Sequence, residues 1–182
     1  MRRVQTEIEG PVVLEPDVHG DERGFFAETF RADVWAGHGV AADFVQDNHS
    51  RSRRGTVRGL HFQTSPGQAK LVRCARGEVY DVVVDLRSGS PAFGRWEGFT
   101  LDDASGRQLF VPVGFAHGFC VVSDVADFVY KCSSYYDPAT ESGIAYDDPE
   151  VGVRWPSGIE LLASERDRSA PRLADVADGL PF

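Results

Sequence analysis

The chain has 182 residues, 42% of them hydrophobic and 11% aromatic, which is enough to build one domain with a substantial core. Its formal net charge of −9 argues against non-specific binding to nucleic acid or to an anionic membrane, because both need a basic face. The segment MRRVQTEIEG lacks the apolar core of a signal peptide and no apolar run approaches the length of a membrane span, so we expect a cytoplasmic protein. Cys74, Cys120 and Cys132 show no CxxC spacing, which predicts reduced, buried thiols.

Strand patterns dominate the chain. The first strands are predicted at residues 12–15 and 25–30, followed by a short amphipathic helix over 30–39 that ends at a glycine. Further strands are predicted at 56–63, 70–74, 78–86, 95–101, 108–111, 117–122 and 126–136, separated by turns rich in Gly, Pro, Ser and Asp. So many short strands at near-regular spacing predict an all-β, antiparallel sandwich or barrel closed on itself, with short helices at its periphery.

No linker, repeat or low-complexity segment divides the chain, so we expect one domain over residues 1–182. Its β core is expected at about 10–155, and residues 156–182 form a tail with at most short helices. The tail contains SERDRSAP, in which charged residues follow one another from Glu165 to Arg168. These side chains either form a solvated surface run or reach back across the mouth of the barrel.

Alternation along two predicted strands separates their faces. In the strand over 78–86, Asp81, Val83 and Asp85 share one face, opposite Tyr80 and three aliphatic residues. In the strand over 126–136 one face combines apolar bodies with phenols and is the better cavity lining, whereas the other face places Lys131 toward solvent. The cavity face comprises Phe128, Tyr130, Cys132, Ser134 and Tyr136.

The segment VRGLHFQTSPGQAK, residues 57–70, carries the most chemical information. His61 can act as a base near neutral pH, and Lys70, one of only two lysines, can approach a single oxygen as a compact donor. The alternative interpretation is a core histidine and a surface lysine. Four arginines without a carboxylate precede His61 and would attract an anionic small ligand; for Arg51 and Arg53 we favour a solvated loop.

Arg58 and His61 have opposite strand parity. Both can face one cavity only if Gly59 bends the strand or forms a bulge, which glycine permits at little cost.

Six blocks taken together closely resemble the dTDP-4-dehydrorhamnose 3,5-epimerase family, in order and along nearly the whole chain. They are RGFFAETF at 23–30, QDNHS at 46–50, RGTVRGLHFQ at 54–63, GQAKLVRCARGEVYDVVVDLR at 67–87, FVPVGFAHGF at 110–119 and YKCSSYYDP at 130–138. The resemblance implies a cupin-like jelly-roll barrel, a homodimer, and cofactor-independent epimerisation of a dTDP-linked 4-keto-6-deoxyhexose at the two carbons beside its ketone.

The resemblance also implies roles for individual residues. His61 would be the base, Asp167 would orient its ring, Lys70 would hold the enolate oxygen, and Tyr130 would return the proton with its pKa lowered by a nearby ammonium. Tyr136 matches the position that stacks on thymine, and Arg166 stands where the family often has lysine. The remaining matched positions hold sugar, phosphate or nucleoside: Arg23, Glu28, Gln46, Asn48, Arg58, His117 and Glu141.

Three other readings compete with the double epimerase. A metal-dependent cupin would need clustered ligands, but only His117 among the other histidines falls in a predicted strand, so we expect no metal. A sugar-nucleotide-binding module would not need His61, Lys70, Tyr130 and Asp167 together. Relatives that invert only carbon 3 or only carbon 5 would keep the same residues, because a small shift of the sugar decides which proton the base reaches.

Overall fold

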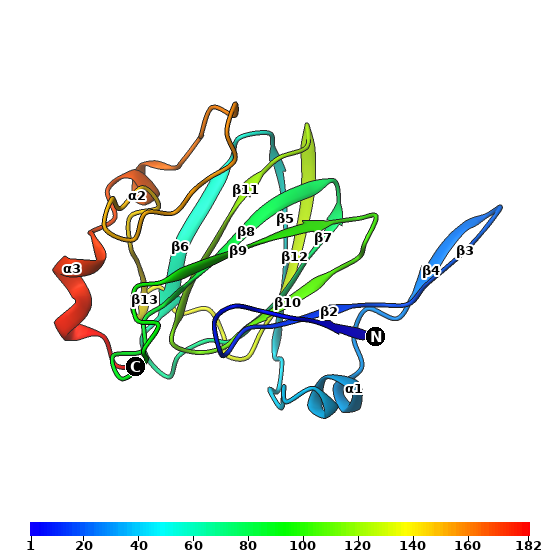
Figure 1. Cartoon of the computed structure of the whole chain (residues 1–182), viewed down its shortest axis with the longest axis horizontal. Helices are drawn as coiled ribbons and strands as arrows, with labels where there is room; N and C mark the ends of the chain where they lie inside the picture. The colour runs from blue at the N-terminus through cyan, green and yellow to red at the C-terminus, as the bar shows by residue number, and fades with distance from the viewer.

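Two antiparallel sheets packed face to face form the body of the computed structural model, which describes residues 1–182 (Figure 1). The six-stranded sheet contains, in spatial order, β1 (Arg2–Val4), β2 (Val12–Glu15), β10 (Gln108–Val111), β7 (Lys70–Arg76), β12 (Val125–Cys132) and β5 (Gln46–Arg53). The five-stranded sheet contains β13 (Glu141–Gly143), β6 (Val57–Gln63), β11 (Phe115–Val121), β8 (Glu78–Asp85) and β9 (Trp96–Asp102). This architecture confirms the predicted all-β class, a cupin-like jelly roll.

The remaining elements lie outside the two sheets. β3 (Val18–Asp21) and β4 (Gly24–Ala27) form a separate hairpin that projects away from the body (Figure 1). The helix α1 (Ala32–Gly37) buries Trp35 against the outside of the six-stranded sheet. In the tail, α2 (Glu165–Arg168), α3 (Leu173–Val176) and the 3-10 turn η1 (Ala177–Gly179) lie on the opposite side, beside β6. None of these helices has the length and apolarity required to span a membrane.

The core fills the space between the sheets and continues on both outer faces. The alternation predicted for β8 is confirmed, since Val79 and Val83 belong to the cluster between the sheets, whereas Val82 and Val84 pack against the C-terminal tail. The three cysteines are buried and free, as predicted. Their burial raises the pKa of the Cys74 thiol to about 12 and that of Cys120 to about 11, so both stay protonated at neutral pH.

The strand β5 is absent from the sequence prediction, which placed Arg51 and Arg53 in a solvated loop. That placement is wrong, because residues 46–53 pair with β12 over its whole length at the edge of the six-stranded sheet. The sequence QDNHSRSR contains no hydrophobic residue, so its alternation carries no apolar signal. Arg51 makes two hydrogen bonds to Asp127 across the strand pair, with Nε 2.6 Å from Oδ1.

Two further predictions need correction at strand ends. The strand predicted over 25–30 is the second half of the projecting hairpin and ends at Ala27. β12 ends at Cys132, so Ser134 and Tyr136 do not belong to the same strand face as Tyr130. The chain bends at Ser133 and Ser134, where the Ser133 backbone nitrogen donates to the Ala69 carbonyl oxygen and the Ser133 hydroxyl accepts from the Ala69 backbone nitrogen.

Candidate active site

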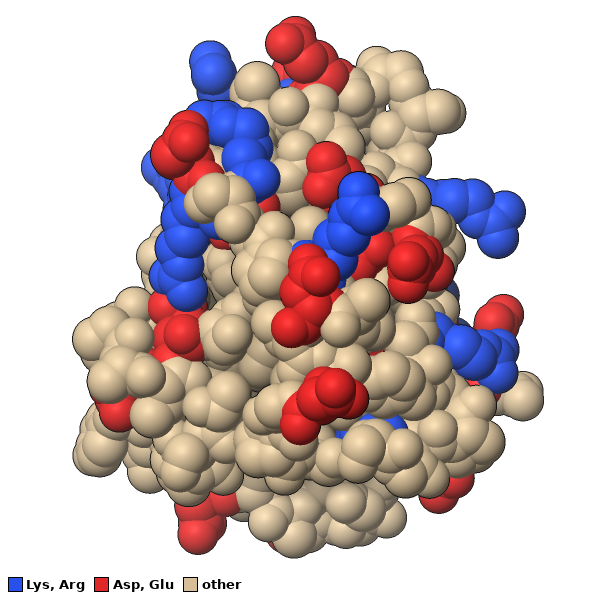
Figure 2. Space-filling model, turned by 90° about the vertical axis from the view of Figure 1, so that its left-hand side faces the viewer, with Lys and Arg blue, Asp and Glu red and all other residues tan.

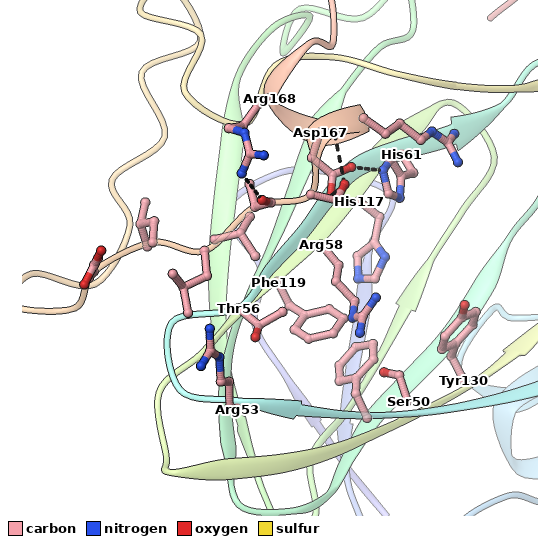
Figure 3. Close-up of a pocket in the computed structure, with 18 of the residues that line it drawn as sticks. Ser50, Arg53, Thr56, Arg58, His61, His117, Phe119, Tyr130, Asp167 and Arg168 are labelled. Carbon is pink, nitrogen blue, oxygen red and sulfur yellow. Dashed lines mark hydrogen bonds and ion pairs between the residues drawn. The ribbon is translucent and has the colours of Figure 1, made fainter.

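A cavity of about 910 Å³ lies between the two sheets, where β5 and β12 face β6, and the tail segment 160–168 closes one side of it (Figure 3). It brings together all four residues predicted to carry the chemistry and three of the predicted binding residues: His61, Lys70, Tyr130, Asp167, Arg58, His117 and Arg166. On the face that carries the C-terminal helices, basic and acidic side chains stand close to one another without forming a continuous basic surface (Figure 2).

The predicted bulge in β6 is present. β6 pairs with β11 so that His61 lies opposite His117 and Arg58 lies opposite Phe119. Between these two pairs β6 advances by three residues and β11 by only two, which is a β-bulge in β6. Gly59 has a φ of 139°, a conformation that L side chains rarely adopt. The extra residue resolves the parity conflict, because the side chains of Arg58 and His61 both line the cavity.

His61 and Asp167 form a hydrogen-bonded pair, with His61 Nε2 2.6 Å from Asp167 Oδ1 (Figure 3). Asp167 is held in turn by Ser164, whose hydroxyl donates to Oδ2 at 2.8 Å and accepts from the Asp167 backbone nitrogen at 3.1 Å as the N-cap of α2. Burial raises the pKa of Asp167, but the hydrogen bonds from His61 and Ser164 outweigh it and leave the pKa below its ordinary value. The carboxylate is thus ionised, and Nδ1 of His61 is free to meet a substrate.

This pair decides between the two interpretations of SERDRSAP. Asp167 is only 5% exposed and Arg166 lines the cavity, so these two side chains reach back across the barrel mouth. Glu165 remains exposed, as a surface run would, and pairs with Arg168, which also lines the cavity.

Lys70 and Tyr130 approach the cavity from the six-stranded sheet, opposite the strand that carries His61. Burial lowers the pKa of Lys70, although Cys132, Glu141 and Asp81 oppose this. The expectation that a nearby ammonium lowers the pKa of Tyr130 is wrong: burial raises it, and the opposing cation is Arg58. The phenol therefore stays protonated at neutral pH, as a proton donor must.

A second buried histidine–carboxylate pair joins His117 to Asp81. The sequence predicted His117 as a site residue but did not predict Asp81. His117 Nε2 lies 3.0 Å from both oxygens of Asp81, which is fully buried. Burial raises the pKa of Asp81, while His117 and Lys70 lower it. Strand alternation could have identified Asp81, because it shares its face of β8 with the inward-pointing Val83. A carboxylate on an interior face needs a buried partner.

Four predicted binding residues form a chain of polar contacts that ends at Arg166 on the cavity wall. Gln46 accepts from the Tyr136 backbone nitrogen at 2.9 Å, and the Tyr136 hydroxyl donates to Glu141 at 2.9 Å. Arg166 lies 2.6 Å from the same Glu141 oxygen. Asn48, next to Gln46 on β5, donates to Cys132 Sγ at 3.5 Å. Tyr136 itself is 51% exposed, so its ring is free to contact a planar ligand.

The remaining predictions have mixed outcomes. Arg23 and Glu28 do not reach this cavity: Arg23 lies on the projecting hairpin, paired with Asp21 and with 85% of its side chain exposed. Arg53, expected in a solvated loop, is exposed but lies on β5 and lines the cavity. No third His, Cys, Asp or Glu joins a pair to form a metal-ligating group.

Comparison with known proteins places this geometry in a family. The family model described as dTDP-4-dehydrorhamnose 3,5-epimerase matches residues 5–175. The dTDP-4-dehydrorhamnose 3,5-epimerase of Pseudomonas aeruginosa is 47% identical over 184 residues, covering 100% of both chains. The dTDP-4-dehydrorhamnose 3-epimerase of Streptomyces niveus is also 47% identical, over 98% of this chain and 86% of its own.

A solved structure agrees with these sequence matches. The crystal structure of the dTDP-6-deoxy-D-glucose-3,5-epimerase from Legionella pneumophila, in complex with dTDP-4-keto-L-rhamnose, superposes with a TM-score of 0.95 at 46% identity and covers 99% of this chain and 97% of that one. The chain therefore belongs to the dTDP-4-dehydrorhamnose 3,5-epimerase family of isomerases.

Proposed function

We propose that the protein epimerises dTDP-4-keto-6-deoxy-D-glucose at C3 and C5, giving dTDP-4-keto-L-rhamnose without a cofactor. The observation that carries this proposal is the pair of His61, on the five-stranded sheet, with Asp167 of α2, facing Tyr130 and Lys70 on the six-stranded sheet. A binding module would need neither a carboxylate-supported base nor a phenol on the opposite wall.

The proposed reaction inverts each carbon in two proton transfers. His61 Nδ1 removes the proton from the carbon beside the ketone, and the electron pair of the broken C–H bond forms the enolate double bond while charge moves to the keto oxygen. Asp167 stabilises the resulting imidazolium, and the Lys70 ammonium stabilises the enolate oxygen. Tyr130 then donates its phenolic proton to the opposite face of the carbon. Proton exchange with water restores His61 and Tyr130.

The substrate nucleotide is assigned to the end of the cavity where Tyr136, Glu141 and Arg166 meet. Tyr136 offers an exposed ring for stacking on thymine, and the Glu141 carboxylate can accept from a base or ribose donor. Arg58 and Arg166 suit the diphosphate, because a guanidinium binds phosphate oxygens in a bidentate manner. The sugar then lies between His61 and Tyr130.

A homodimer is part of the proposal, and it accounts for Arg23 and Glu28. The hairpin that carries Arg23 exposes Phe25 and Phe26, 72% and 73% accessible, which a lone subunit leaves in water. In addition, Arg73 lies on the outer face of the six-stranded sheet and makes no ion pair there. Its burial lowers its pKa, because no carboxylate compensates for the lost solvation of the charge. A second copy packed on this face would cover these groups and bring the hairpin, with Arg23, to the partner's cavity.

Epimerisation at one carbon only is the second candidate. It is favoured by the 3-epimerase of Streptomyces niveus, which is as similar to this chain as the double epimerase of Pseudomonas aeruginosa.

The test is proton NMR of the purified protein with dTDP-4-keto-6-deoxyglucose in D2O, with chelator and without added metal. Deuterium entering at C3 and C5 supports the metal-free 3,5-epimerase, and deuterium at one carbon supports a mono-epimerase. The absence of exchange at both carbons would refute the proposal.

A further inference from the structure

A short backbone pairing fastens the tail segment before α2 to the start of β6. The Leu162 nitrogen donates to the Gly55 carbonyl oxygen at 2.8 Å, and the Leu162 carbonyl oxygen accepts from the Val57 nitrogen at 3.0 Å. Val57 is the first residue of β6, the strand that also carries His61. The start of α2 is therefore tied by its backbone to the strand that holds the base.

Ser164 and Asp167 occupy the N-cap and N3 positions of α2, which is the spacing of a capping box. In a complete capping box the N3 side chain accepts a hydrogen bond from the N-cap backbone nitrogen. The Asp167 carboxylate makes two other contacts, Oδ1 with His61 Nε2 at 2.6 Å and Oδ2 with the Ser164 hydroxyl at 2.8 Å. The carboxylate is thus directed to the base instead of to the helix backbone.

Ser164 is the only residue besides His61 whose side chain hydrogen-bonds this carboxylate. Arg166 acts on it through charge alone, since its guanidinium pairs with Glu141. An aspartate side chain has two rotatable bonds, so a second hydrogen bond on the opposite oxygen fixes the direction of Oδ1. A hydroxyl that donates to Oδ2 also favours the ionised carboxylate, which accepts from Nε2 and leaves the imidazole lone pair on Nδ1.

We propose that Ser164 is a positioning residue for the His61–Asp167 pair, and that its hydroxyl holds Asp167 Oδ1 on His61 Nε2 so that Nδ1 faces the substrate. This inference rests on the proposed function and deepens it. Ser164 acts through Asp167 and not on the sugar. Its loss should therefore slow proton removal at C3 and C5 alike and leave KM unchanged.

The test uses the different properties of glycine and alanine at an N-cap. Both remove the hydroxyl, but glycine preserves most of the capping stability and alanine does not. Ser164→Gly and Ser164→Ala should both lower kcat about tenfold, the order of one hydrogen bond to a charged group. Only Ser164→Ala should melt at a clearly lower temperature. Ser164→Thr keeps the hydroxyl and should retain most of the activity.

A double-mutant cycle separates positioning from a purely structural role. In an Asp167→Ala background, Ser164→Gly should not reduce the residual rate further, because the group that it positions is gone. Three results would overturn the role of Ser164 and leave the proposed function standing: a normal kcat in Ser164→Gly, a loss of kcat that follows the melting temperature, or the same loss in both backgrounds.

Proton NMR of the imidazole tests the same role without substrate. A short hydrogen bond to a carboxylate shifts the Nε2 proton far downfield of the amides and protects it from exchange, and His61→Asn identifies its resonance. We expect this resonance in the wild type and in Ser164→Thr, and its loss in Ser164→Gly. If the wild type exchanges neither substrate proton, the proposed function fails. Loss of the resonance in Ser164→Gly would still support the hold of Ser164 on the pair, and its persistence would overturn it.

Discussion

Gly59 and Gly118 lie in direct contact on neighbouring strands beneath His61. A Cβ on Gly59 would come within 2.5 Å of the Gly118 Cα, and a Cβ on Gly118 would come within 2.7 Å of the Arg58 carbonyl oxygen. The bulge that turns Arg58 and His61 into the same cavity therefore depends on two glycines. The local geometry of the site is set in the backbone as much as in its polar side chains.

Gly59→Ala should damage both the fold and the activity. The new methyl group meets backbone atoms that cannot move away, and the positive φ of Gly59 adds strain, so we expect a loss of about 2–5 kcal/mol in the free energy of unfolding. Urea denaturation measures it. Gly158→Ala is the matched control, because Gly158 also has a positive φ but nothing within 4 Å of its Cβ position, and it should lose only about 1 kcal/mol. Equal losses in the two variants would contradict the packing argument.

Replacing the base and the acid should give distinguishable defects. His61→Asn should abolish deuterium entry at both carbons, because the other histidine–carboxylate pair of the cavity, His117 with Asp81, is almost fully buried, whereas the His61 side chain is 25% exposed. Tyr130→Phe should retain proton removal by His61 but return the proton to the original face, so exchange continues while inversion fails. NMR in D2O reports exchange and configuration in one spectrum. Normal exchange in His61→Asn would exclude His61 as the base.

The alkaline limb of the pH–rate profile should belong to Lys70. Burial lowers the pKa of Lys70 and raises the pKa of Tyr130, so it moves the loss of the ammonium proton to lower pH and the loss of the phenolic proton to higher pH. The rate should therefore fall as the pH rises through the lowered pKa of Lys70. Lys70→Arg keeps its charge at high pH and, although weaker at pH 8, should show the fall in rate shifted to higher pH in brief pH-jump assays. An unchanged alkaline limb in this variant would assign it to another group.

The sequence predicted the strands that carry an apolar alternation and missed four others, the short β1, β3 and β13 and the eight-residue β5. β8 and β10 have hydrophobic residues at every second position or more, and their predicted positions agree with the structure to within one residue. β5 is polar on both faces because one face lines the cavity and the other pairs with β12 neighbours in water, as Arg51 does with Asp127. β5 therefore has no hydrophobic alternation from which a strand could be predicted.

The site residues and the pairing of His61 with Asp167 were predicted through the resemblance, and the other connections came from the structure. Parity arguments anticipated the bulge at Gly59 because only it reconciles Arg58 with His61. The pairing of His61 with Asp167 spans 106 positions of sequence and depends on how the tail folds back, which no local pattern records. The raised pKa of Tyr130 likewise reflects its burial, a quantity set by the assembled sheets.

Arg53 and Arg51 provide a matched pair of substitutions on one strand. Arg53 lines the cavity, whereas Arg51 lies outside it and is held by Asp127. Arg53→Ala should raise KM for the anionic substrate about three- to tenfold at low ionic strength, and added salt should reduce the difference, because a solvated charge acts through a screened field. Arg51→Ala should leave KM unchanged. A similar rise in KM in both variants would indicate a general effect of net charge instead of a local one.

Subunit complementation tests whether the projecting hairpin serves the partner's cavity. His61→Asn inactivates a cavity but leaves its own hairpin intact, and Arg23→Ala does the reverse. If Arg23 acts in the partner, a mixed dimer has one cavity with both residues. Equal co-expression should then recover about a quarter of the wild-type activity, since half of the dimers are mixed and each has one complete site.

The control for this experiment is co-expression of His61→Asn with Lys70→Met. These residues line the same cavity of one chain, so a mixed dimer contains no complete site and should recover nothing. Differently tagged chains, purified in two affinity steps, isolate the mixed dimer from the parents. If the mixed dimer of His61→Asn with Arg23→Ala is no more active than the Arg23→Ala homodimer, then Arg23 does not act across the interface. The hairpin would then need another reason to expose Phe25 and Phe26.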